Sequence, residues 1–254
     1  MARLSRYSSI EVKPTIKASY QHAGTYGAQD VLFDWTAFKL PKGGNKLIGF
    51  SMMYNGPAGI NDPAPCEVLF ARQTTGGGDI TAGTAPATLG NANTTAFAVA
   101  SNPNFRQIVG GFQMLESDFL HTVYNIGTTN VGTTNNHGIV LDEYGASLDD
   151  SEGNITYYIG ATTTTASPNL SSNVQINGSQ DDENDLLVKT TDPTLMFAPG
   201  DVLHTHTDVL IGTVGTVTTS TNILLEGTTT TGVAAANLYL YNINPITIRL
   251  SFER

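Results

Sequence analysis

The sequence predicts an all-β protein: a jelly-roll-like β-sandwich with a small β-barrel module inserted before the last strand of the sandwich. The first observation behind this prediction is composition. Only 13% of the 254 residues are charged, and 26 residues are glycine. Such a chain suits strands joined by many turns, whereas helices need recurring Glu, Lys and Leu. The second observation is a compact series of short strands in residues 197–227, and the third is an alternating C-terminal strand.

Residues 197–227 predict the barrel. The Pro-Gly-Asp turn at residues 199–201 opens the series, because proline presets φ and glycine supplies a positive φ. Gly212 and Gly215 would weaken a flat strand, but in a small barrel they mark sharp bends or close backbone approach. The module is expected to span residues 186–241. Its β-branched content predicts strands over residues 202–206, 209–217 and 223–225.

Residues 245–254, PITIRLSFER, show the clearest two-residue period in the chain. An alternating strand has one buried face and one wet face. The residues expected on the buried face are Ile246, Ile248, Leu250 and Phe252. Because an isolated strand is unstable and the module closes on itself, this strand must pair with the larger sheet system. The sandwich is therefore expected to comprise residues 31–183 plus 243–254.

Residues 1–30 are polar and are expected to form an N-terminal arm, with one short edge strand interrupted by Pro14. Such an arm becomes ordered by packing on a neighbouring subunit. Residues 31–40 and 46–54 flank a glycine-rich turn, which favours a hairpin between them. Further strands are expected over residues 67–71, 121–126, 139–144 and 155–165, with a short one at Val174 and Ile176.

Residues 105–120 predict a strand followed by a short helix within FQMLESDFL. Two polar stretches, residues 73–93 and 128–138, are expected to be long exposed excursions. Long loops of this kind in a compact domain are usually functional or disordered.

The formal net charge of −10 disfavours nucleic acid as a partner, since the chain would repel phosphate backbones. Cys66 is the single cysteine, which excludes an intrachain disulfide and a cysteine-based zinc site. It is expected to be a small buried hydrophobic residue. The sequence contains no apolar run of signal-peptide or membrane-span length, so we expect synthesis in a cytoplasm and no membrane contact.

His204 and His206 are the one pair of residues with metal-ligand spacing. Side chains two apart on a strand point to the same side, and a threefold axis would bring six imidazoles together. Because no third ligand lies nearby in sequence, the favoured interpretation is two polar residues on a wet face. The acidic runs at 149–152 and 181–185 lack EF-hand spacing and are interpreted as solvated loops. No metal and no cofactor are expected.

No enzyme motif is present. The sequence lacks GxSxG, HExxH and P-loop patterns. The other histidines are scattered along the sequence and form no catalytic pattern with Ser or acidic residues; they are His22, His121 and His137. A non-enzymatic protein is therefore expected.

Residues 192–226, 237–254 and 31–50 together resemble structural proteins of tailed bacteriophages, particularly marine ones. The resemblance rests on patterns such as PGD followed by IGTV and on the sandwich-like strands. It implies a virion component made in the host cytoplasm, most simply a capsid decoration (cement) protein. It also implies the major capsid protein or other virion proteins as partners, and symmetric repetition suggests a homotrimer. A tail or head-tail structural protein is the alternative within this class.

A host-surface or glycan recognition module is the competing class. Saccharide sites usually present aromatic platforms beside polar groups. The excursions at 73–93 and 128–138 contain no Trp, Tyr or Phe, which disfavours this class. The remaining candidate platforms are Tyr157, Tyr158, Tyr239 and Tyr241.

Overall fold

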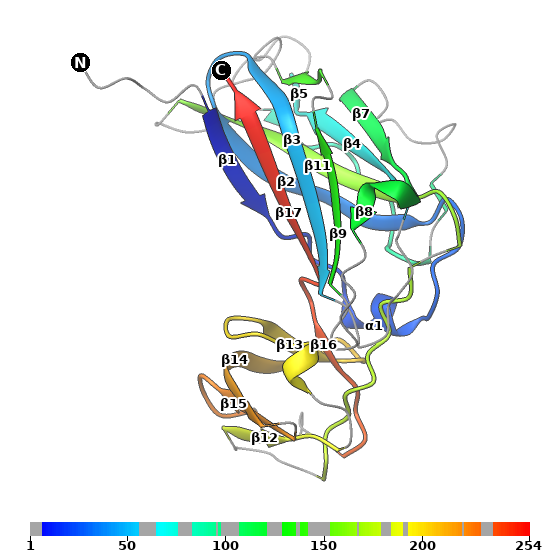
Figure 1. The fold of residues 1–254 in the computed structure, drawn as a ribbon, viewed down its shortest axis with the longest axis vertical. Coiled ribbons are helices and arrows are strands. Elements are labelled where there is room, and N and C mark those ends of the chain that lie inside the picture. Colours follow the sequence, from blue (N-terminus) through cyan, green and yellow to red (C-terminus); the bar gives the residue numbers. More distant parts are fainter. Residues whose placement is uncertain are drawn as a thin grey trace, which may run out of the picture.

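The computed structural model confirms the all-β fold. Two antiparallel sheets stack as a sandwich, and a smaller curled sheet forms a second unit beyond one end of it (Figure 1). The structure describes residues 7–55, 65–75, 83–94, 96–97, 107–120, 129–135, 138–141, 153–166, 168–178, 184–189, 193–219, 221–229 and 236–254.

The first sheet of the sandwich has the strand order β1-β17-β3-β9-β8, and β10 also pairs with β3. The bounds of these strands are Tyr7–Val12 (β1), Ile246–Glu253 (β17), Asn45–Asn55 (β3), Thr129–Asn135 (β9), Phe119–Leu120 (β8) and Val140–Leu141 (β10). The second sheet has the order β2-β11-β4-β7. Its strands span Val31–Pro41 (β2), Asn154–Thr163 (β11), Cys66–Arg72 (β4) and Ile108–Met114 (β7). A separate ribbon pairs β5 (Thr74–Thr75) with β6 (Gly83–Thr84).

The C-terminal strand β17 has the position and the buried face that the sequence predicts. It lies between β1 and β3 and pairs with both. Its four alternating apolar side chains, from Ile246 to Phe252, are each 0% exposed. Phe252 stacks on Phe38 of β2 in the facing sheet, with ring centroids 6.3 Å apart. Burial of each such side chain contributes about 1.5–3 kcal/mol relative to exposure, so this strand fastens both sheets to one core.

The predicted hairpin between β2 and β3 is wrong. β2 pairs with β11, whereas β3 pairs with β17 and β9, so the chain crosses from one sheet to the other between them. The alternation that identifies both strands does not specify the strand that each one pairs with. The buried Asn45 fixes the crossing, because its Nδ2 donates to Pro41 O at 3.0 Å and to Gly43 O at 2.7 Å.

The N-terminal arm expected over residues 1–30 is not an arm from Tyr7 onward. β1 pairs with β17 along its length. Val12, Ile16 and Tyr26 are all buried in the sandwich core. These apolar residues are too widely spaced in the sequence to show a strand or helix period, so the sequence pattern predicts no core for this segment.

The two predicted excursions also belong partly to the folded body. Residues 129–135 form β9, which pairs with both β3 and β8. Leu89 and Ala92, near the end of the first excursion, are buried. The helix expected within FQMLESDFL is a single 3-10 turn, η3 (Glu116–Asp118). The strand expected over 121–126 and the acidic run 149–152 lie outside the described residues.

The second unit is a small barrel. Its sheet has the order β12-β15-β14-β13-β16, and the 3-10 turn η4 (Pro193–Leu195) lies between β12 and β13 in the chain. The strands span Asp185–Leu187 (β12), Asn222–Leu225 (β15), Leu210–Thr219 (β14), Val202–Thr205 (β13) and Leu240–Asn242 (β16). Residues 174–177 close the sheet, because they bond to residues 237–240 on one side and to residues 187–189 on the other.

The barrel has a core of its own, which includes Val174 and Ile176. The barrel therefore begins ahead of the expected boundary at residue 186, and residues 174–177 belong to it rather than to the sandwich. The two glycines of β14 mark irregular positions as predicted, since register shifts lie next to both. A Cβ added at Gly215 would lie 3.2 Å from Leu224 O.

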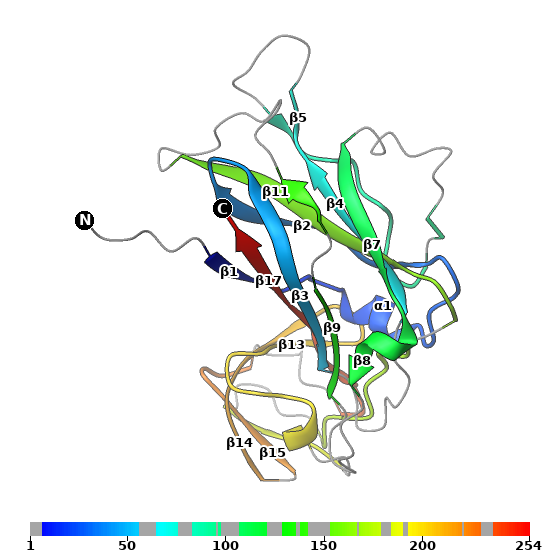
Figure 2. The same cartoon turned by 45° about the horizontal axis from the view of Figure 1, so that its top comes forward.

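Helix α1 (Ala18–His22) lies between the two units in both views (Figures 1 and 2). The buried Gln21 donates from Nε2 to Ile16 O and to Asn242 O, both at 2.8 Å. Ser19 donates from its backbone N and its Oγ to the carboxylate of Asp208, at 2.9 and 2.5 Å. These hydrogen bonds join the barrel to the segment that enters the sandwich.

Candidate functional site

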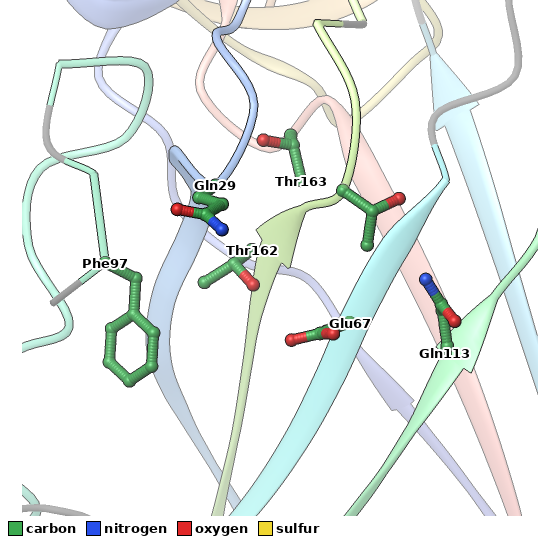
Figure 3. A pocket seen from close by; sticks show the side chains of 7 residues that line it. Gln29, Glu67, Phe97, Gln113, Thr162 and Thr163 are labelled. Atoms are coloured by element: carbon green, nitrogen blue, oxygen red, sulfur yellow. The ribbon is translucent and has the colours of Figure 1, made fainter. Parts of the chain in front are cut away.

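A polar hollow of about 370 Å³ lies on the outer face of the second sandwich sheet (Figure 3). A row of paired residues crosses the sheet there, with Thr162 of β11 opposite Glu67 of β4 and Glu67 opposite Gln113 of β7. The adjacent residues Ala161 and Cys66 are buried in the sandwich core. Because side chains alternate between the faces of a strand, the row itself points away from that core.

Gln29 and Phe97 border the hollow on the side of β11 (Figure 3). Their backbones are joined, since Phe97 N donates to Gln29 O at 2.8 Å. The segment that leads to Phe97 is also fastened to β2, because Leu89 N donates to Asp34 Oδ1 at 2.7 Å. The aromatic ring is therefore presented from an anchored segment.

The backbone of Gln29 has a φ of +68°, which lies in the left-handed region. This conformation costs a residue other than glycine about 1–2 kcal/mol. The neighbouring turn compensates through Thr163, whose O accepts from Gln29 N at 2.9 Å and whose Oγ1 donates to Gly27 O at 2.6 Å. Backbone strain that the surrounding structure holds in place is typical of functional sites.

Four of the polar side chains that line the hollow are not used by the fold, whereas the Oγ1 of Thr163 donates to Gly27 O. Within the described part of the chain, the side chains of Gln29, Glu67, Gln113 and Thr162 have no hydrogen-bond partner. The lining, as far as the structure describes the chain, contains one carboxylate and no Lys, Arg or His. The hollow thus offers a negatively charged acceptor, two carboxamides that can donate and accept, hydroxyl groups and an aromatic face.

His204 and His206 are not brought together as a pair. β13 ends at Thr205, so His206 lies in the following turn. His204 Nδ1 lies 3.2 Å from Asp208 O, whereas His206 Nδ1 accepts from Tyr239 N at 3.3 Å. Over the described ranges, no group of three His, Cys, Asp or Glu residues is placed to hold a metal ion.

His206 instead belongs to a cluster at the junction of the two units. Its ring centroid lies 4.8 Å from that of His22 in α1. His22 Nδ1 lies 2.7 Å from the hydroxyl of Tyr241, whose ring is buried. Partial burial and the neighbouring His206 lower the pKa of His22 below 6.5, and burial raises the pKa of Tyr241 to about 12. The folded junction therefore favours the neutral form of His22.

Most of the other residues singled out from the sequence are structural. Tyr157, Tyr158 and Tyr241 are buried and offer no exposed platform, whereas Tyr239 is half-buried beside His22. Cys66 is fully buried, as predicted, and burial raises the pKa of its thiol. A buried neutral thiol is a poor nucleophile.

Reasoning from the sequence missed the hollow. Its residues come from separate segments of the chain, and each polar residue within a strand has the pattern of an ordinary wet face. The signal available in the sequence was weak: Glu67 and Gln113 each precede or follow a buried apolar residue, but nothing shows that their strands are neighbours. Only the pairing of β11, β4 and β7 brings them together.

None of the helices in the described ranges has the length and apolar character needed to cross a membrane. A comparison of the chain with protein-family models, curated proteins and solved structures found no match.

Proposed function

We propose that the protein is a non-enzymatic structural component of a bacteriophage particle, a capsid decoration protein that binds and stabilises the shell lattice. The proposal rests first on the resemblance of residues 192–226 and 237–254 to structural proteins of tailed phages. The structural observation that supports it is a sheet edge of the sandwich that no strand of the described residues covers. The sandwich and the barrel are joined by hydrogen bonds.

The free edge belongs to β1, the terminal strand of the first sheet. No strand of the described residues pairs with its outer edge. Proteins usually protect such an edge with charges or proline, because its unpaired N–H and C=O groups can add a strand from another chain. Within this edge, Ser8, Ser9 and Ile10 carry no charge. A shell subunit or a second copy of the chain would extend the sheet there.

The placement of β1 changes how the N-terminal segment would contribute. Residues 7–26 do not reach a neighbouring subunit as an arm, because β1, Ile16 and Tyr26 belong to the sandwich. The contact proposed is therefore made by the side of the sandwich. Trimeric self-association remains part of the proposal, since repeated weak contacts gain strength through avidity.

Adding charges to the edge of β1 tests the proposed contact with a shell subunit. The double substitution Tyr7→Lys and Ser9→Lys adds charges along β1, and Leu224→Lys on the outer face of the barrel is the matched control. We expect the β1 variant to lose co-sedimentation with shells of the phage that encodes it, while the control keeps it. Equal co-sedimentation of the β1 variant and the unmodified chain would refute the edge contact.

A tail or head-tail role is the alternative within the same class. It shares the free edge and differs in copy number, since a vertex or tail position needs few copies and a shell lattice needs many. Counting copies per particle separates the two.

A further inference from the structure

We propose that the hollow bounded by Gln29, Glu67, Phe97 and Gln113 binds a neutral saccharide. The inference concerns the outer face of the second sheet and does not depend on where in a particle the protein resides. It follows from the donors and acceptors that the fold leaves unused, from the aromatic ring beside them and from the charge of the lining.

The polar groups suit a ligand that carries many hydroxyls. Glu67 can accept two hydrogen bonds, which matches adjacent hydroxyl groups on a sugar ring. Gln29 and Gln113 stand on either side of it and can each donate and accept (Figure 3). A hydroxyl group both donates and accepts hydrogen bonds, so the hydroxyls of one sugar can bond to the carboxylate and to the carboxamides at the same time. Hydrogen bonds that involve the carboxylate are the strongest that this lining can form.

The ring of Phe97 supplies the apolar part of the site. A sugar ring has one face made of C–H groups, which packs on an aromatic face. Phe97 is half-buried and its backbone is bonded to that of Gln29, so little ordering is needed when a ligand arrives. Small-molecule sites commonly combine an aromatic wall with a few positioned polar groups.

The charge of the hollow decides between classes of saccharide. Among the described residues that line it, Glu67 is the single charged one and none is a cation. An acidic sugar would place its carboxylate or sulfate near that of Glu67 without a compensating charge, which disfavours binding. A neutral oligosaccharide meets no such repulsion. A basic peptide is the competing ligand, and it would use the carboxylate but leave the two carboxamides without a comparable role.

The test uses the full chain and an array of oligosaccharides. The array holds neutral glucose, galactose, mannose and N-acetylglucosamine oligomers, their sialylated and sulfated counterparts, and an oligolysine peptide. The best neutral ligand is then titrated by calorimetry against Glu67→Gln, Phe97→Ala and Gln113→Ala. Glu226→Gln, an exposed acid on the barrel, is the matched control. Circular dichroism verifies that each variant is folded.

We expect saturable binding of a neutral oligosaccharide and an affinity loss of about tenfold or more for each variant in the hollow, since each removes a contact to the ligand. The Glu226 control should bind as the unmodified chain does. Preference for the acidic sugars, preference for oligolysine, or no saccharide binding would each overturn the proposal. Binding that survives all three substitutions would place the site elsewhere and overturn it as well.

Discussion

The substitution Gln21→Met tests how the barrel is held against the sandwich. Gln21 is 2% exposed, and its Nε2 donates to Ile16 O and Asn242 O, both at 2.8 Å. Methionine has a similar volume, so the change removes two hydrogen bonds without opening a large cavity. Each of the two carbonyls loses its donor, and a buried carbonyl left in this way costs about 1.5 kcal/mol when the lower part of the usual range is taken.

The expected loss is therefore about 3 kcal/mol, which corresponds to a fall in melting temperature of roughly 6–12 °C for a chain of this size. Differential scanning calorimetry gives the shift, and fluorescence of the single Trp35 follows the sandwich separately. Gln113→Met is the matched control, because that side chain has no hydrogen-bond partner within the described residues. A melting temperature within 1 °C of the unmodified chain for Gln21→Met would refute the account of the junction.

Three further predictions concern other parts of the fold. Because the pKa of His22 is lowered in the folded protein, the unfolded chain binds protons more readily below pH 6.5. Stability should thus fall as the pH drops below that value, and His22→Gln should flatten the fall in urea titrations. Gly111→Ala should destabilise the sandwich by about 1–3 kcal/mol, because the added Cβ would lie 2.8 Å from Val68 O. Gly227→Ala, with nothing within 4 Å, should be nearly neutral by the same measurement. Cys66 should resist iodoacetamide in the native protein and react only after denaturation, which mass spectrometry of the alkylated chain would show.

Elements with a clear local sequence pattern could be predicted, whereas elements that depend on contacts with distant strands could not. The apolar residues of β17 alternate without interruption, so both the strand and its buried face could be predicted. β9 could not, because TNVGTTN has few apolar residues and becomes a strand by pairing with β3 and β8. The packing of the N-terminal segment could not be predicted for the same reason, since isolated apolar residues such as Ile16 are buried only by strands that are distant in the sequence.

The candidate site is harder to predict than the fold, for a related reason. Glu67 and Gln113 are separated by more than forty residues in the chain, and only the pairing of β4 with β7 places them opposite each other. The left-handed backbone of Gln29 is bonded to Thr163, which comes from β11. Neither relation has a signature within a short stretch of sequence. The excursions at 73–93 and 128–138 contain no aromatic residue, but Phe97 lies just after the first of them.

The measurement that tests the proposed particle role most directly is quantitative mass spectrometry of particles purified from a culture that expresses the gene for this chain. Copies of this protein are counted against copies of the major shell protein, with isotope-labelled peptides of both as standards. The decoration proposal predicts a copy number comparable with that of the shell lattice. A handful of copies would assign the protein to the tail or portal vertex, and its absence from the particles would contradict the proposed function altogether.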